Sequence, residues 1–79
     1  MEYDTDKIDQ TVMALLSLTM FNDGDGTRAW KGQDWEVMNR LFKRGWIGDP
    51  KSKAKSVVVT EEGERMATQL FDQLFAKSS

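Results

Sequence analysis

Residues 48–66 read GDPKSKAKSVVVTEEGERM, and this stretch changes character twice. It opens with a proline-containing turn and three alternating lysines, continues with three valines and ends in an acidic segment. Because valine is stiff at χ1 and packs well on a pleated surface, the valine run predicts a strand over 57–59. Thr60 can cap a following helix, and the glutamates after it complement the helix dipole. The lysine-rich residues 49–55 then form the connection that enters the strand.

The segment before this connection has the pattern of a helix that ends in glycine. Apolar residues recur at helical spacing over 35–42, and either Gln33 or Asp34 offers an N-cap. Gly45 suits the left-handed position past the helix, where Trp46 can fold back over the last turn. We therefore expect a helix that leads through a tight corner into the basic connection.

Two more helices and two short strands complete the expected order. Residues 4–21 predict a first helix, and residues 60–75 predict a last, amphipathic one. Short strands are expected over 28–31 and at 46–47. Helices against a small antiparallel sheet make an α+β domain, with three helices packed on two or three strands. At 79 residues, the chain is expected to form one domain over 1–79.

The small size of the chain raises the question of what stabilises its core. A domain this short buries only about 60% of the surface of its unfolded chain. With no Cys and no His, disulfides and the commonest soft metal ligands are both absent. The predicted first helix is also apolar over much of its circumference, so we expect a homodimer. The alternatives are that the other two helices cover this face, and that the chain is a stable monomer.

Three tryptophans, Trp30, Trp35 and Trp46, can serve either the core or a binding surface. Each can bury about 150–250 Å². A thin core needs that area, so we favour burial over stacking on bases or insertion into a partner.

Several function classes are disfavoured by what the sequence lacks. Without His or Cys, acid–base catalysis would fall to Asp, Glu, Lys or the lone Tyr3, and no nucleophile–base pair or glycine-rich phosphate loop is visible. We therefore expect no enzyme, no cofactor and no small-molecule substrate. No apolar run approaches the roughly 20 residues of a membrane span, and the N-terminus is acidic rather than signal-like, which favours the cytoplasm.

The NDGDG segment at 22–26 contains part of a calcium-loop pattern. If Gly26 is the turn glycine, Phe21 and Gly32 occupy the first and twelfth ligand positions, and neither side chain binds calcium. Gly, Asn and Asp are also turn formers, so we interpret the segment as a turn and expect no metal.

Basic residues gather in the middle of the chain. The span 28–55 has a net charge of +5, the remainder carries −7, and the whole chain has −2. Alternating lysines in the connection can point the same way, and cations on the preceding helix lie on neighbouring turns, so together they can follow a phosphate backbone. The alternative is a solvated edge on which lysines discourage strand-to-strand aggregation. The candidate nucleic-acid-binding residues are Lys31, Arg40, Lys43, Arg44, Lys51, Lys53 and Lys55.

Two resemblances attach to these segments. VMNRLFKRGWI, the basic turn and SVVVTEEGERM, within residues 33–70, resemble the end of winged-helix regulators of the multiple-antibiotic-resistance regulator type. This resemblance implies that Arg40, Lys43 and Arg44 lie on the helix before a wing. It also implies that the lysines of 51–55 lie in the wing itself, and that the Thr-x-x-Gly segment opens the last helix.

The whole chain is also similar to a family of short uncharacterised bacterial proteins, a domain of unknown function. The shared pieces are YDTDKID, RAWKG, DW, DPKSKAKSVV and TEEG. A full helix-turn-helix has two helices between the first strand and the wing, whereas residues 31–45 have room for one, so specific reading of the major groove is not implied.

These observations predict a winged-helix-like α+β domain. The leading functional hypothesis is a small nucleic-acid-binding or regulatory module with duplex DNA as the candidate partner. The alternative is a homodimeric protein–protein interaction module that binds no nucleic acid.

Overall fold

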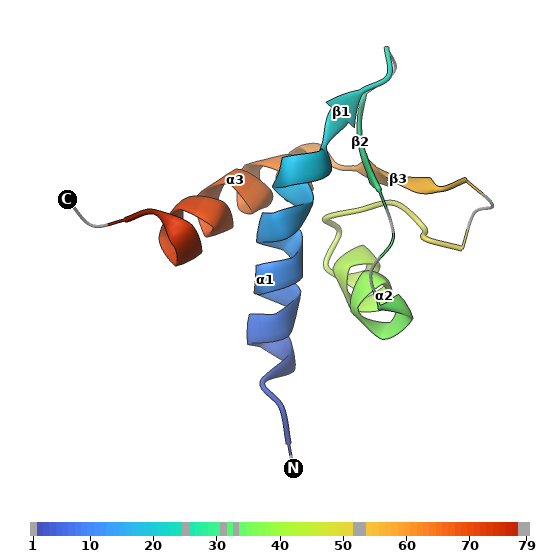
Figure 1. Ribbon diagram of the computed structural model, residues 1–79. Coiled ribbons are helices and arrows are strands. Elements are labelled where there is room, and N and C mark those ends of the chain that lie inside the picture. The colour runs from blue at the N-terminus through green and yellow to red at the C-terminus, as the bar shows by residue number, and fades with distance from the viewer. Residues whose placement is uncertain (1, 25, 31, 33, 52–53, 78–79) are drawn as a thin grey trace.

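The computed structural model describes residues 2–24, 26–30, 32, 34–51 and 54–77. Three helices and three strands form an α+β arrangement consistent with a winged-helix-like fold, which confirms the predicted fold class (Figure 1). In chain order the elements are α1 (Thr5–Leu16), the 3₁₀ turn η1 (Ser17–Thr19), β1 (Phe21–Asn22), β2 (Thr27–Trp30), α2 (Trp35–Lys43), β3 (Ser56–Val59) and α3 (Glu61–Phe75).

The sheet is antiparallel throughout, in the order β1-β2-β3. Phe21 pairs with Arg28 across β1 and β2, and Trp30 pairs with Ser56 across β2 and β3. In Figure 1, α1 stands between α2 on one side and the free end of α3 on the other. The sheet lies at the end of the molecule where α1 finishes, far from the N-terminus.

Each helix begins at a side-chain cap. Asp4 accepts from the Lys7 N–H at 3.0 Å and Asp34 accepts from the Val37 N–H at 3.3 Å. The Thr60 hydroxyl accepts from the Gly63 N–H at 2.9 Å. A short polar side chain satisfies an N–H that has no partner inside its helix, so these residues fix where each helix starts.

The end of the first helix differs from the prediction. Regular α-helix stops at Leu16, one 3₁₀ turn follows, and Phe21 belongs to β1 rather than to the helix. The turn after it closes a hairpin, because the Asp23 N–H donates to the Gly26 carbonyl at 3.1 Å and Gly24 adopts a φ of 97°. Strand pairing with β2 therefore overrides the helical spacing that runs up to residue 21.

The corner after α2 confirms the role predicted for Gly45. Its φ is 81°, and its N–H donates to the Phe42 carbonyl at 3.0 Å. The Trp46 N–H donates to the Leu41 carbonyl at 3.2 Å, and these two bonds together form a Schellman motif. The strand expected at 46–47 is only a single bridge, between Ile47 and Val59.

The start of α3 is packed tightly onto this corner. Thr60 donates from its N–H to the Trp46 carbonyl at 3.1 Å and from its hydroxyl to the Gly45 carbonyl at 2.7 Å. A Cβ built on Gly63 would lie 1.9 Å from the Trp46 carbonyl oxygen. These contacts explain why Thr60 and Gly63 occupy the Thr-x-x-Gly positions. Threonine ties α3 to the corner, and glycine lets the two backbones touch.

The tryptophans correct the expectation that all three fill the core. Trp46 is buried, but Trp30 and Trp35 are 52% and 51% exposed. Ala29 takes the inward position on β2, so strand alternation turns Trp30 outward. Trp35 opens α2 on its solvent face. The fully buried centre is made instead by smaller side chains: Met13, Ala14, Ala29, Met38, Leu41, Ile47, Val57 and Ala67.

Candidate nucleic-acid interface

Two cations at the C-terminal end of α2 that the sequence offers for phosphate binding are turned toward α1. Arg40 Nε donates to both carboxylate oxygens of Asp9, at 2.9 and 2.8 Å. Arg44 Nη2 lies 2.6 Å from Asp6 and 3.6 Å from Asp9, and the guanidinium sits over the Trp46 ring at 5.2 Å. The hydrogen bond that Arg40 donates to Asp9 raises the pKa of Arg40 above its ordinary value, although burial opposes the shift. Both arginines therefore join helices within the chain.

Sequence reasoning missed Asp9, the residue that organises these contacts. Its carboxylate is wholly buried, whereas the Arg40 side chain is 32% exposed. One signal was available, because Asp9 precedes Met13 and Leu16 at i+4 and i+7, on the apolar face of α1. An acidic residue in such a stripe indicates a buried pair, since an unpaired charge there is costly.

Of the remaining predicted cations, the structure describes one on α2 and two in the connection. Lys43 is exposed on α2, and Lys51 and Lys55 are exposed where the basic connection begins and ends. The Lys51 N–H donates to the Asp49 carboxylate at 2.9 Å, which folds the start of the connection. The other two predicted residues, Lys31 and Lys53, lie outside the described residues.

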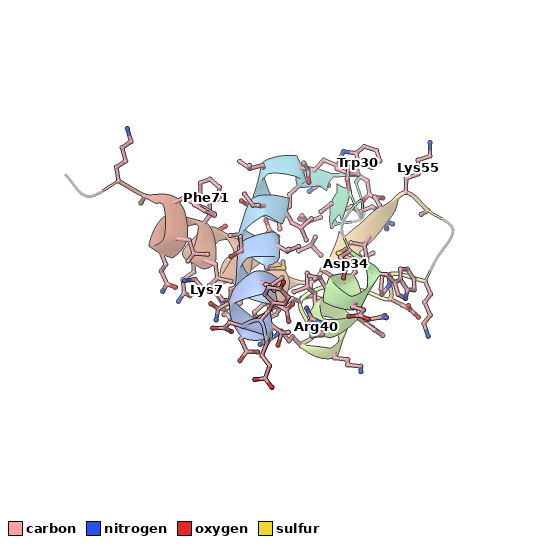
Figure 2. The ribbon with its side chains drawn as sticks, turned by 60° about the horizontal axis from the view of Figure 1, so that its bottom comes forward. Lys7, Trp30, Asp34, Arg40, Lys55 and Phe71 are labelled. Atoms are coloured by element: carbon pink, nitrogen blue, oxygen red, sulfur yellow. The ribbon has the colours of Figure 1, made fainter. Side chains whose placement is uncertain are left out.

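Next to the connection, the outward face of the sheet carries an exposed aromatic pair. The Phe21 and Trp30 rings lie 5.4 Å apart, and both side chains remain open to solvent. Trp30 pairs with Ser56, the residue that follows Lys55, and Figure 2 shows the Trp30 and Lys55 side chains at the same corner of the molecule.

Arg28 completes this face between the two aromatic side chains and β3. Its Nε donates to the Ser56 hydroxyl at 2.7 Å and its Nη2 to the Ser56 carbonyl at 2.9 Å, so its guanidinium is held against the sheet. Asp23 lies 3.9 Å from the same guanidinium and offsets part of its charge. We use the name wing face for the outward sheet residues Phe21, Arg28, Trp30 and Val58 taken together with Lys51 and Lys55, the exposed lysines at the two ends of the basic connection.

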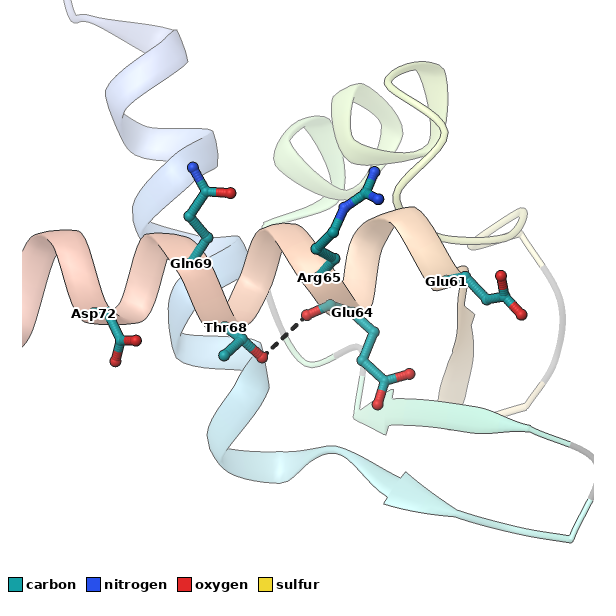
Figure 3. Close-up of a pocket in the computed structure, with 6 residues that line it drawn as sticks. All are labelled: Glu61, Glu64, Arg65, Thr68, Gln69 and Asp72. Carbon is teal, nitrogen blue, oxygen red and sulfur yellow. Dashed lines mark hydrogen bonds between the residues drawn. The ribbon is translucent and has the colours of Figure 1, made fainter.

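A second surface feature is a hollow of about 620 Å³ on the outer side of α3. Figure 3 shows that its side chains all come from this one helix and point outward without converging. Thr68 donates to the Glu64 carbonyl at 3.1 Å, and the Glu64 carboxylate accepts from Thr27 at 3.1 Å. The lining residues are Glu61, Glu64, Arg65, Thr68, Gln69 and Asp72. Across the described part of the chain, no cluster of acidic side chains is arranged to hold a metal ion.

Comparison with known proteins now places this chain. Residues 4–77 match a family described as a domain of unknown function, DUF6429. The chain belongs to this family. It is also 51% identical over 77 residues to "Uncharacterized protein y4hR" from Sinorhizobium fredii (strain NBRC 101917 / NGR234), an alignment that covers 98% of this chain and 100% of that protein. No solved structure matches it.

The first and last residues of the family match lie close to the ends of the fold. It starts at Asp4, the N-cap of α1, and ends at Lys77, two residues beyond α3. The DUF6429 domain therefore contains the wing face, the arginine pairs and all three helices. The resemblance to short uncharacterised bacterial proteins is confirmed, and the resemblance to winged-helix regulators stays a prediction. Among the described helices, none has the length and apolarity that crossing a membrane requires.

Proposed function

We propose that this DUF6429 protein is a nucleic-acid-binding module, without catalytic activity and acting in the cytoplasm, and that its contact surface is the wing face. The observation that carries the proposal is the exposed Phe21–Trp30 pair beside the lysines of the basic connection. Half-exposed aromatic side chains next to cations suit a strand whose bases stack and whose phosphates are negative.

The phosphate contacts are assigned to the connection rather than to α2. Lys51 and Lys55 are exposed and bracket a segment that the winged-helix resemblance equates with the wing. Arg40 and Arg44 already bond to buried or nearby carboxylates, so moving them to phosphate would leave Asp9 buried without its partners. The third cation predicted on this helix, Lys43, is exposed and forms no such ion pair with a described residue.

The base contact is assigned to Trp30. Base–aromatic stacking is worth about 1–3 kcal/mol per base and requires an accessible ring face. Bases in an intact duplex are already stacked on each other, so this surface favours single-stranded segments over duplex DNA. The partner is therefore still the polyanion that the charge distribution predicts, but it is single-stranded rather than duplex.

The test is a fluorescence titration with random single-stranded and duplex oligonucleotides of equal length, at low and moderate salt. We expect binding that weakens with salt, that is tighter for single strands, and that quenches tryptophan emission. Each lysine–phosphate contact contributes about 0.7 to the logarithmic salt slope of a single strand. The Lys51→Ala/Lys55→Ala variant should therefore lower this slope by roughly 1.4.

The matched control is Lys7→Ala/Lys77→Ala, which removes the same charge from the other side of the molecule. Figure 2 shows Lys7 on the opposite side from Lys55, and Lys77 follows the far end of α3. The control should retain the parental slope. Absence of salt-sensitive binding to either oligonucleotide, or equal losses in the two double variants, would refute the proposal.

A further inference from the structure

The helix α1 leaves an apolar stripe partly uncovered alongside its buried residues. Asp9, Met13 and Leu16 are buried, while Ile8 is 38% exposed and Leu15 is 40% exposed. Leu18, in the η1 turn that follows α1, is 68% exposed. Ile8 and Leu15 are seven residues apart, so they lie almost in line on the helix surface, two turns from each other. The described part of the chain therefore does not cover the whole apolar surface of α1.

The two ends of this stripe have different shapes. The N-terminal half borders a hollow of about 390 Å³. Its lining residues are Tyr3, Asp4, Lys7, Ile8, Thr11 and Val12. The C-terminal half instead carries the protruding side chains of Leu15 and Leu18. One helix face thus presents both an apolar hollow and the apolar side chains that a hollow of this kind can receive.

We infer that this face joins two copies of the chain, with their α1 helices antiparallel about a two-fold axis. An isologous interface uses the same patch on both subunits, so the patch must be complementary to itself. An axis between Thr11 and Val12 places Ile8 against the partner's Leu15, and Leu15 against the partner's Ile8. It also brings the protruding half of each helix over the hollow half of the other.

The chemistry of the stripe fits this occupant. The Thr11 hydroxyl donates to the Lys7 carbonyl of its own helix at 2.8 Å, so Thr11 brings no unpaired donor to the axis. The charged residues Asp4 and Lys7 lie at one end, where an antiparallel partner leaves them at the rim. A single short helix makes a small interface, in the class below about 1,200 Å² that forms weak and transient complexes. The surface lies on α1, so this association is independent of the wing face.

Sedimentation equilibrium from about 10 μM to about 1 mM tests the association, since weak interfaces populate dimers in that range. We expect the average mass to rise from one chain toward two. Leu15→Glu should lower the association constant at least tenfold, while Leu74→Glu should leave it unchanged. Leu74 is the matched control because it is 37% exposed and lies on α3. A mass of one chain throughout, or equal effects of the two variants, would overturn the inference.

Cysteine cross-linking tests the two-fold axis itself. The chain contains no Cys, so any disulfide must come from an introduced residue. Thr11→Cys places a thiol next to the axis, and Thr68→Cys is its control on the outer side of α3. Both hydroxyls donate to the carbonyl four residues earlier, so both variants lose the same kind of bond. Covalent dimer should form at least tenfold faster from Thr11→Cys under mild oxidation, and equal rates would contradict the axis.

Discussion

The carboxylate of Asp9, which has no solvent exposure, accepts two hydrogen bonds from the Nε of Arg40, whose side chain is about one-third exposed. The pair therefore joins a buried anion on α1 to a cation on α2 that retains access to water. Arg44 adds a second cation at 3.6 Å from the same carboxylate. The contact holds α2 against α1, and it withdraws two arginines from the charged surface.

The first prediction is that the two halves of this pair respond unequally to substitution. Arg40→Met leaves a buried carboxylate with only the more distant Arg44, and an underpaired buried charge is strongly destabilising. Asp9→Asn removes the buried charge, and the arginines can then turn toward water, so a loss of about 1 kcal/mol is expected. Urea unfolding of both variants measures the difference.

The double variant Asp9→Leu/Arg40→Met serves as the control for this asymmetry. It replaces the ionic contact with an apolar one, and such exchanges of buried pairs are often neutral or stabilising. Its stability should exceed that of Arg40→Met alone. If Asp9→Asn proves the more damaging single change, the assignment of Asp9 as the costly partner is wrong.

The second prediction concerns the contact between Gly63 and Trp46. Alanine inside a helix is normally better than glycine by about 0.5–1 kcal/mol. Here the added Cβ would meet the Trp46 backbone, which cannot move aside as a flexible side chain can. We expect Gly63→Ala to destabilise the fold by about 2 kcal/mol and to lower the melting temperature by roughly 10 °C.

Gly32→Ala provides the comparison, because a Cβ at Gly32 has nothing within 4 Å. It should melt within a few degrees of the parent. A Gly63→Ala variant as stable as Gly32→Ala would show that the corner yields to α3, and that the close approach is not required.

Local chemistry made much of this fold predictable from the sequence. Helix caps such as Thr60, the left-handed Gly45 and the valine strand depend on short-range interactions that sequence spacing records. The Asp9–Arg40 pair joins residues 31 positions apart, and no local pattern encodes that separation. The outward turn of Trp30 depends on strand alternation, which only its pairing with β3 fixes. The structure therefore differs from the sequence-based prediction more at the candidate site than in the fold, because the positions of the site residues depend on tertiary contacts.

The third prediction is that acrylamide quenches the fluorescence of the exposed tryptophans more strongly than that of the buried one. Trp46 is only 8% exposed, whereas Trp30 and Trp35 are each about half exposed. Acrylamide should quench most of the emission readily and leave a resistant, blue-shifted fraction. Trp46→Phe should abolish that fraction, and Trp30→Phe should preserve it. A resistant fraction that survives in Trp46→Phe would contradict the burial of Trp46 in the folded chain.

The last prediction compares two exposed lysines that the sequence places in one basic cluster. Lys43 lies on α2, and Lys55 lies in the basic connection, at the same corner of the molecule as Trp30. If α2 contacted nucleic acid, Lys43→Ala would weaken binding at least as much as Lys55→Ala, since both changes remove one charge. Because the wing face combines Lys55 with an exposed ring, we expect Lys55→Ala to weaken single-strand binding several-fold at low salt. Lys43→Ala should change it less than two-fold, and the reverse order would move the interface to α2.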